Sequence, residues 1–203
     1  MVASTVAYKE TEIRGKFADR IELEKFIGKK VKVAKLKQHR FRFSVLFTTG
    51  NKKGLDLQIR SHDNQPEIIL KVGKHTALNR KEFKLHIPPE SFGVAVDLFY
   101  QIGFKSGVVA DCEDWIYLIN GKYELKVSSC DGNIFCWEIE PLKEIASVNE
   151  LTKVAFNFGL KPLSESETAK YWKWMKMYGN RKLDIGKLSE WYSNYLKRLK
   201  STC

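Results

Sequence analysis

Short runs of alternating apolar and polar residues recur along the first two thirds of the chain, and this repetition strongly constrains the fold. Examples are LDLQIRS, which begins at Leu55, and YELKVSS, which begins at Tyr123. Turn-forming stretches such as SHDNQP and SCDGN separate most of the runs. Alternation with a period of two is typical of a half-buried strand, and short polar turns join antiparallel neighbours. The sequence therefore predicts a meander of antiparallel strands from Tyr8 to about Glu140.

Helical patterns interrupt these strands and then replace them. We predict a helix near residues 18–27, with Gly28 just past its end, and another within residues 88–103. After Pro141 the pattern is helical throughout. Ser147 and Ser164 each precede a glutamate by three residues, which is the spacing of a capping box. The predicted class is thus α+β.

Charged side chains stand at every second position of several predicted strands. In YKETEIRG these are Glu10, Glu12 and Arg14, which point the same way if the segment is extended. The same pattern recurs in later runs at Gln58 and Arg60, Arg80, Glu82 and Lys84, Glu124 and Lys126, and Glu138 and Glu140. One explanation is the solvent-facing side of a half-exposed sheet with cross-strand salt bridges. The other is a closed barrel of about eight strands, whose charged lumen holds one small ligand.

A lumen of the second kind would have a definite chemical use. Carboxylates supply the oxygen ligands that Mg²⁺ or Mn²⁺ prefers, whereas Arg and Lys hold phosphates by charge-assisted hydrogen bonds. A bound metal ion neutralises phosphate charge and orients or activates the attacking group. The sequence pattern alone leaves both explanations open.

Five segments, taken in order, resemble motifs of the CYTH superfamily of triphosphate tunnel enzymes. This superfamily includes class IV adenylyl cyclases and thiamine, inorganic and RNA triphosphatases. ETEIR resembles its opening ExExK with Arg in place of Lys, LDLQIRS its LRIR strand, and EIILKVG its LTLKG strand. NRKEFKLHI is similar to the strand that follows, and FCWEIE to the closing EIE. The resemblance runs from about residue 8 to residue 163 and ends in a GLKP segment.

The resemblance implies an eight-stranded antiparallel closed barrel with flanking helices. It implies a tunnel domain over residues 1–163, followed by a basic, aromatic helical extension over residues 164–203. The implied function is to bind a nucleoside triphosphate or inorganic triphosphate with Mg²⁺ or Mn²⁺ and to hydrolyse it. The implied catalytic residues, which also bind metal together with Glu82, are Glu10, Glu12, Glu138 and Glu140. The implied phosphate-binding residues are Arg14, Arg60, Lys71, Arg80, Lys84 and Lys126.

Several positions depart from the superfamily pattern. Where a KxR pair usually precedes an aromatic residue, this chain has Ala110 and Cys112 before Trp115. Lys126 stands where an acidic residue is common, and Lys84 where a second glutamate often stands. Either these lysines restore the lost positive charge, or the site no longer catalyses. The alternatives to a triphosphatase are therefore a class IV-type adenylyl cyclase and a non-catalytic protein that binds a nucleotide or the triphosphate end of an RNA.

Composition and cysteine spacing bound the remaining expectations. A formal net charge of +11 favours partners that carry phosphate, although charge alone does not identify one. The four cysteines form no CxxC pair, so we predict buried or free thiols and a reducing cytoplasm. No apolar stretch approaches the roughly 20 residues that span a bilayer, and no signal-peptide core is apparent, so we predict no membrane contact.

The C-terminal segment interleaves Lys and Arg with Trp and Tyr, a mixture that can bind single-stranded RNA. Its aromatic residues nevertheless fall largely at helical spacing. Trp172, Met175, Trp191 and Tyr195 are therefore also candidates for core residues that dock the helices on the barrel. RNA contact through these basic helices and packing against the barrel both remain open at this point.

Overall fold

The computed structural model describes residues 8–30, 34–49, 54–73, 79–142, 146–175 and 181–202; the side chains of residues 8–10, 30, 79, 80 and 202 lie outside that description. The elements in chain order are β1 (Tyr8–Thr11), β2 (Ile13–Lys16), α1 (Arg20–Lys30), β3 (Lys35–Phe47), β4 (Leu55–His62), β5 (Gln65–Val72), β6 (Asn79–His86), α2 (Phe92–Gln101), β7 (Gly107–Ile119), β8 (Tyr123–Cys130), β9 (Ile134–Pro141), α3 (Val148–Asn157), α4 (Glu165–Trp174), β10 (Arg181–Lys182) and α5 (Ile185–Thr202). The predicted order of strands followed by helices is confirmed.

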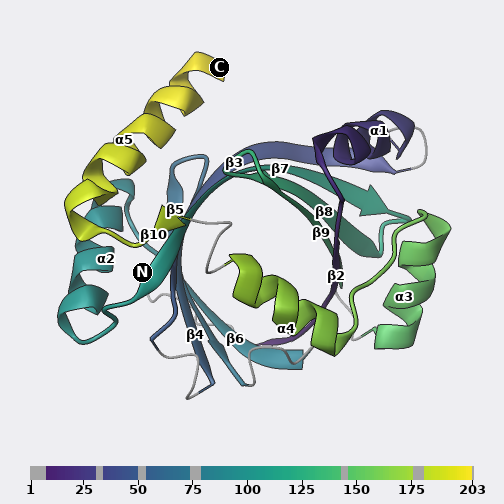
Figure 1. Ribbon diagram of the computed structural model, residues 1–203, viewed down its shortest axis with the longest axis horizontal. Coiled ribbons are helices and arrows are strands. Elements are labelled where there is room, and N and C mark those ends of the chain that lie inside the picture. The colour runs from purple at the N-terminus through teal and green to yellow at the C-terminus, as the bar shows by residue number, and fades with distance from the viewer. Residues whose placement is uncertain are drawn as a thin grey trace.

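All the strands of the described residues form one antiparallel sheet, which curls around a central space (Figure 1). The hydrogen-bonding order runs β1-β6-β5-β4-β3-β7-β8-β9-β2, and β10 adds to β7. The prediction of a closed barrel is therefore confirmed only as a curled, open barrel. The reason is that the opening strand breaks at Glu12, so that β1 pairs with β6 and β2 pairs with β9.

Hairpin turns hold neighbouring strands in register. Asp63 and Asn64 have φ values of 47° and 65°, and Asn120 and Gly121 have values of 51° and 68°. Two consecutive residues with positive φ are typical of the type I′ turn, whose twist matches that of the flanking strands. The turn-forming segments predicted from the sequence thus join β4 to β5 and β7 to β8.

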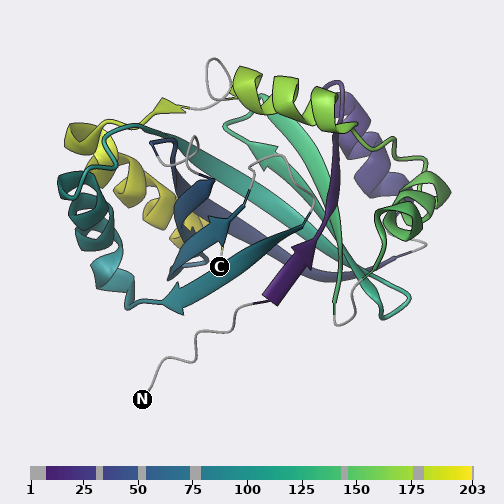
Figure 2. The same cartoon turned by 90° about the horizontal axis from the view of Figure 1, so that it is seen from below.

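The apolar faces of the strands are buried under helices on two sides of the barrel. On one side Ile13, Trp137 and Leu151 belong to a core that also includes residues of α1 and α3. On the other side α2 and α5 cover a second core, in which Phe43 and Tyr195 are fully buried. Figures 1 and 2 show these two pairs of helices on opposite flanks of the sheet. Since the outer faces are occupied, the charged faces of the same strands turn inward.

Close packing fixes the join between β2 and β9. Gly15 lies opposite Trp137 in the register of these strands. A Cβ atom at Gly15 would come within 2.3 Å of the Trp137 ring. The indole therefore fills the space that any other side chain at this position would occupy, and β2 can approach β9 closely.

Capping residues start α3 and α4 where the sequence predicts. The Ser147 hydroxyl accepts a hydrogen bond from the Glu150 amide at 3.2 Å, and Ser164 forms a complete capping box with Glu167. Helix α1 differs from its prediction, because it continues through Gly28 to Lys30. Glycine lowers helix stability without forbidding the helical conformation, so Gly28 is not an obligatory stop.

Helix α4 lies across one end of the barrel (Figures 1 and 2). Met175 and Tyr195, two of the aromatic and apolar residues considered above, are buried, and Trp172 and Trp191 are partly buried against the cores. These residues dock the C-terminal helices on the sheet, whereas RNA contact by this segment remains a prediction, as does the domain boundary at residue 163. Among the described helices, none combines the length and apolar character needed to cross a membrane.

The prediction of free thiols is wrong for two cysteines, because Cys112 and Cys130 form a disulfide. Strands β7 and β8 are adjacent, and their register places these two residues directly opposite each other. The pairing depends on strand register, and motif spacing therefore does not reveal it. Cys136 is a free thiol, and burial raises its pKa to about 11. Cys203 lies outside the described residues.

Candidate functional site

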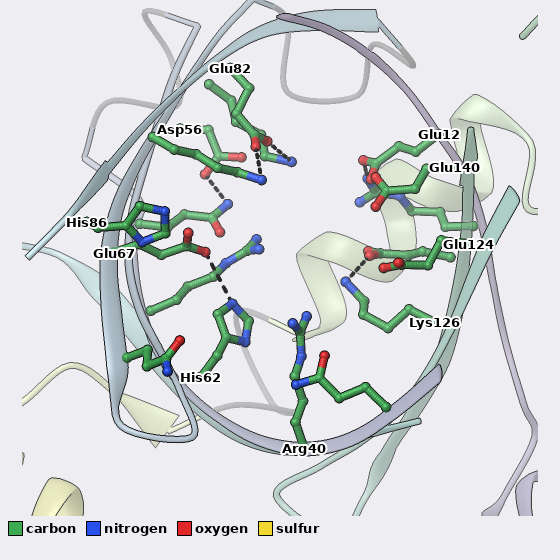
Figure 3. Close-up of a pocket in the computed structure, with 18 of the residues that line it drawn as sticks. Glu12, Arg40, Asp56, His62, Glu67, Glu82, His86, Glu124, Lys126 and Glu140 are labelled. Atoms are coloured by element: carbon green, nitrogen blue, oxygen red, sulfur yellow. Dashed lines mark hydrogen bonds and ion pairs between the residues drawn. The ribbon is translucent and has the colours of Figure 1, made fainter. Parts of the chain in front are cut away.

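A cavity of about 440 Å³ occupies the interior of the curled sheet (Figure 3). Its described lining includes eight carboxylates, six Lys or Arg side chains and two histidines, contributed by β2 to β6, β8, β9 and the segments that join them. Trp172 of α4 closes part of the wall. The charged faces are therefore not simply the wet side of an open sheet, because they converge on a common enclosed space.

Nine of the eleven site residues predicted from the sequence line this cavity. They are Glu12, Arg14, Arg60, Lys71, Glu82, Lys84, Lys126, Glu138 and Glu140. The other two, Glu10 and Arg80, lie opposite each other in the β1–β6 pair, but their side chains are outside the description. The structure thus brings the predicted residues together, while the role of each remains a prediction.

One wall of the cavity gathers carboxylates from the junction of β1 and β2, from β8 and from β9. Figure 3 shows Glu12, Glu124 and Glu140 on the same side, and the strand register places Glu124 opposite Glu140. Glu12 forms an ion pair with Arg14, and Glu138 forms one with Lys126. Burial alone would raise the pKa of Glu138, but Lys126 and Arg14 hold it well below its ordinary range. Glu138 therefore stays ionised at neutral pH.

A second group of paired charges lies on β5 and β6. The Glu82 carboxylate sits 2.8 Å from Lys71 Nζ and 2.7 Å from Lys84 Nζ. Burial would raise the pKa of Glu82, yet the two ammonium groups lower it far below its ordinary range. Glu82 therefore orients two cations toward the cavity and stays ionised while it does so.

The carboxylate wall offers the donors that a hard divalent cation requires. Glu12, Glu138 and Glu140 could supply oxygen ligands, which suit Mg²⁺ or Mn²⁺ better than softer metals. Within the part of the chain that the structure describes, no three acidic, histidine or cysteine side chains are close enough to form a metal site. The ion pairs to Arg14 and Lys126 engage two of these carboxylates. The donor chemistry fits such a metal ion, and metal binding would have to rearrange these pairs.

The opposite wall, on β3 and β4, contains groups that the sequence analysis did not select. Arg40 and His62 line the cavity, and Figure 3 shows both pointing inward. His62 Nε2 lies 3.2 Å from a Glu67 oxygen. Burial and three nearby arginines lower the pKa of His62 to about 4, whereas that of Glu67 falls to about 2, because its bond to His62 and nearby cations outweigh burial. The alternation in HRFRF is the signal that could have identified this wall.

Beneath this wall lies a buried ion pair. Arg42 Nε and Nη2 donate hydrogen bonds to the two oxygens of Asp114 at 2.8 and 3.1 Å, and Ser128 donates a third at 2.7 Å. Burial would raise the pKa of Asp114, but Arg42 holds it far below its ordinary range. Neither residue is among those that line the cavity, so the pair stabilises the join of β3 and β7 beside it.

Neither of the two positions that lack the expected cations lines the cavity. Ala110 is part of a small apolar cluster that also includes the Cys112–Cys130 disulfide, Ile134 and Met175. The cluster adjoins the Arg42–Asp114 pair, since Arg42 Nη2 lies 3.9 Å from Cys130 Sγ, and Tyr171 and Trp172 of α4 pack against it. The positions that lack the KxR pair thus belong to an apolar cluster.

Comparison with known proteins gives a likeness in structure alone. No family model and no curated protein sequence matches the chain. A conserved hypothetical protein from Pyrococcus furiosus superimposes with a TM-score of 0.61 at 21% identity, covering 78% of this chain and 99% of that one. A proposed adenylate cyclase from Vibrio parahaemolyticus superimposes with a TM-score of 0.55 at 12% identity. The match covers 80% of this chain and 93% of that one.

A proposed adenylyl cyclase from Hippeastrum, described as having a dominant triphosphatase activity, is also similar. It gives a TM-score of 0.54 at 14% identity, covering 87% of this chain and 98% of that one. The chain therefore shares its fold with these proteins, as the motif resemblance predicted. At these identities the likeness concerns the fold, so the argument for an activity has to come from the cavity.

Proposed function

We propose that this chain binds a nucleotide or other triphosphate together with Mg²⁺ or Mn²⁺ in the cavity and hydrolyses it. The observation that carries the proposal is the convergence of both signs of charge, from strands far apart in the sequence, on one 440 Å³ space. Proteins of similar fold include one described as a triphosphatase and others described as proposed adenylate cyclases. These descriptions support a triphosphate as the ligand class.

The charge balance of the lining supports the need for a metal ion. Among the described residues the cavity has two more carboxylates than Lys and Arg side chains. A triphosphate would add several further negative charges to this enclosed space. Repulsion between ligand and lining would then oppose binding unless a cation accompanied the ligand. A divalent ion, held by Glu12, Glu138 and Glu140, would provide that compensation and would polarise a phosphoryl oxygen.

The protein's own cations have a separate role in this proposal. Arg14, Lys71 and Lys84 reach the cavity from β2, β5 and β6, and Arg60 reaches it from β4. Hydrogen-bond donors on several walls can bind the phosphates from different directions and hold the ligand's triphosphate group in one position. They also stabilise the negative charge on the equatorial oxygens as the terminal phosphoryl group is transferred.

In the hydrolysis, a water oxygen forms a bond to the terminal phosphorus while the bond to the bridging oxygen breaks. The proton that the water loses passes to a phosphate oxygen of the products or to solvent, the terminal group leaves as orthophosphate, and the remaining diphosphate carries the bridging oxygen. Glu138 is suited to orient the attacking water, because its carboxylate stays ionised at neutral pH. Glu140, two residues along the same face of β9, would act with it.

A second candidate is a protein that binds a triphosphate without cleaving it. The observation that favours it is the engagement of the catalytic carboxylates by the chain's own cations, with Lys126 paired to Glu138 and both Lys71 and Lys84 paired to Glu82. A site in which lysines occupy the carboxylates could hold phosphates yet fail to assemble a metal ion and an attacking water.

Phosphorus NMR of the purified protein with Mg²⁺ or Mn²⁺ separates these candidates. ATP and tripolyphosphate are added in separate samples. Orthophosphate production supports the triphosphatase, whereas pyrophosphate and cyclic AMP from ATP would identify a cyclase. Shifted or broadened ligand signals without products would identify the non-catalytic binder. Spectra that match those of the free ligands in every sample would contradict triphosphate binding altogether.

A further inference from the structure

Strand β3 carries two arginines near one of the positions where β7 lacks its expected cations. In the β3–β7 register Arg42 lies opposite Cys112, whereas Ser44 lies opposite Ala110. Arg40, two residues before Arg42, lies opposite Asp114. Residues at alternate positions of a strand share a face, so both arginine side chains project toward the barrel interior. Positive charge that β7 does not supply is therefore present on the neighbouring strand.

The two arginines are in different states. All three guanidinium nitrogens of Arg42 donate hydrogen bonds, two of them to the Asp114 oxygens and one, at 3.2 Å, to the Ser44 hydroxyl. Arg40 Nε is 3.8 Å from the nearer Asp114 oxygen, beyond hydrogen-bonding distance. That oxygen already accepts the 2.8 Å bond from Arg42. Arg42 therefore has a structural partner, while Arg40 shares that partner only weakly.

Arg40 also retains unsatisfied hydrogen-bonding capacity. Within the described part of the chain, Nε of Arg40 and Nε of Arg60 are buried without a hydrogen-bond partner. Burial lowers the pKa of Arg40, and repulsion from Arg42 and Arg60 adds to this effect. A buried guanidinium N–H group without a hydrogen-bond acceptor is destabilising, and an anion in the cavity would satisfy it. Both guanidinium groups line the cavity, where a phosphate could do so.

Two carboxylates near this pair of arginines have other hydrogen-bond partners, although Glu67 stays ionised and lies opposite Arg60 in the β4–β5 register. Glu67 is hydrogen-bonded to His62, and Asp114 is held by Arg42 and Ser128. His62 is itself neutral near pH 7, since burial and three nearby arginines lower its pKa to about 4. Strands β3 and β4 thus contribute two cations, Arg40 and Arg60, and one carboxylate, Asp56, to the cavity lining, so these two strands carry net positive charge there.

We infer that Arg40, together with Arg60, forms a phosphate-binding subsite on the β3–β4 wall that takes over the role of the cations missing from β7. The inference rests on the proposed function, because it concerns the same cavity and the same ligand class. In this arrangement Arg42 is a positioning residue, since it occupies Asp114 and leaves Arg40 available to the ligand. The ligand group that Arg40 recognises is a phosphate of a triphosphate chain.

The test compares ligand-induced stabilisation in matched variants. The melting temperature of each protein is measured alone and with a large excess of tripolyphosphate and Mg²⁺, and each variant serves as its own reference. The variants are Arg40→Gln, the conservative Arg40→Lys, and the control Arg20→Gln. Arg20 lies on the exposed surface of α1, where it pairs with Glu24, and it does not line the cavity.

We expect Arg40→Gln to weaken tripolyphosphate binding about ten- to a hundredfold, the effect of losing hydrogen bonds to a charged group. Its ligand-induced rise in melting temperature should shrink accordingly. Arg40→Lys should restore part of that rise, and Arg20→Gln should retain all of it.

Two outcomes would overturn the inference or its premise, and they can be told apart. If Arg40→Gln lowers the melting temperature of the free protein but retains the full ligand-induced rise, Arg40 only supports Asp114 and the inference is wrong. If the unaltered protein shows no rise with tripolyphosphate and Mg²⁺, the proposed function itself fails, and the subsite fails with it.

Discussion

Arg42 and Asp114 form a two-point hydrogen-bonded ion pair across the β3–β7 join, and the Asp114 side chain is fully buried. The pair connects two strands that are not consecutive in the chain, since β4, β5, β6 and α2 lie between them. It adjoins both the cavity residue Arg40, 3.8 Å from Asp114, and the disulfide residue Cys130, whose Sγ lies 3.9 Å from Arg42 Nη2. Several expectations about stability follow from this position.

Asp114→Asn should lower the free energy of unfolding by about 3 to 5 kcal/mol, because it leaves the buried Arg42 cation without its counter-charge. Urea denaturation monitored by tryptophan fluorescence measures the change. Glu113→Gln is the matched control, since this neighbouring carboxylate pairs with His39 at the surface. Its effect should stay within about 1 kcal/mol. Equal effects of the two substitutions would contradict the importance of the buried pair.

The stability of the protein should fall as the pH drops from about 6.5 to about 4, through the buried His62. Its pKa is about 4 in the folded protein against an ordinary value of 6.5. In this window the unfolded chain binds a proton that the folded chain does not, so the free energy of unfolding decreases by up to about 3 kcal/mol. His62→Gln should flatten the pH profile, and His39→Gln, at the surface, should not. Profiles of the same slope for all three proteins would count against this assignment.

Below about pH 4.5, buried carboxylates with lowered pKa values determine how the free energy of unfolding depends on pH. The folded-state pKa of Glu67 is about 2, and those of Glu82 and Asp114 are lowered further. A carboxylate whose pKa is lowered by folding stabilises the protein above its ordinary pKa, and that contribution is lost as the pH falls toward the folded value. Acid unfolding should therefore steepen below about pH 4.5, as circular dichroism can measure.

Replacement of the β9 carboxylates should abolish most of the proposed activity. Glu138→Gln or Glu140→Gln should lower kcat for tripolyphosphate hydrolysis by at least about a hundredfold, because each removes a charged group that orients water or metal. Glu190→Gln, at an exposed position of α5, is the control. Orthophosphate release measures the rates. Full activity in both β9 variants would remove the carboxylates from the mechanism.

The disulfide should be detectable by alkylation in denaturant without reductant. Peptides that contain Cys136 should be labelled, whereas those that contain Cys112 or Cys130 should be labelled only after reduction. Because the bond joins residues 18 apart, its loss should lower stability by roughly 3 kcal/mol. Melting temperatures with and without reductant test this second point. Labelling of Cys112 before reduction would show that the pair is not bonded.

The contact between Gly15 and Trp137 gives a sharp steric test. Gly15→Ala places a methyl group within 2.3 Å of the indole and should lower the free energy of unfolding by about 1 to 3 kcal/mol. Gly28→Ala is the matched control, because nothing lies within 4 Å of its Cβ position in α1. That change should raise stability by about 0.5 to 1 kcal/mol. If both substitutions stabilise the protein, β2 does not pack on Trp137 as described.

Local pattern was sufficient to predict much of the fold and much of the cavity. The alternation in LDLQIRS and EIILKVG corresponds to β4 and β5, and it correctly places Arg60 and Lys71 on the inner face. This succeeds because a strand's two faces follow directly from its period of two, whatever its neighbours are.

What the sequence did not reveal depends on which strands become neighbours. The Cys112–Cys130 bond requires the β7–β8 register, and the Arg42–Asp114 pair requires β3 to lie beside β7. Arg40 has the same alternation as Arg60, but its importance appears only when the cavity shows which cations have partners. The break of the opening strand at Glu12 likewise has no local signal in a segment of uniform alternation.

That break has a consequence for how the protein is made. Residues 8–16 are synthesised well before β9, yet β2 must wait for this partner, whose Ile139 pairs with Ile13. Pairings between such distant segments form slowly, since the chain between them must be ordered before they meet. Glu12, at the junction, therefore reaches its place only when β9 has been synthesised. A nascent chain that stops before β9 has no complete carboxylate wall, and the proposed chemistry can begin only once this late pairing has formed.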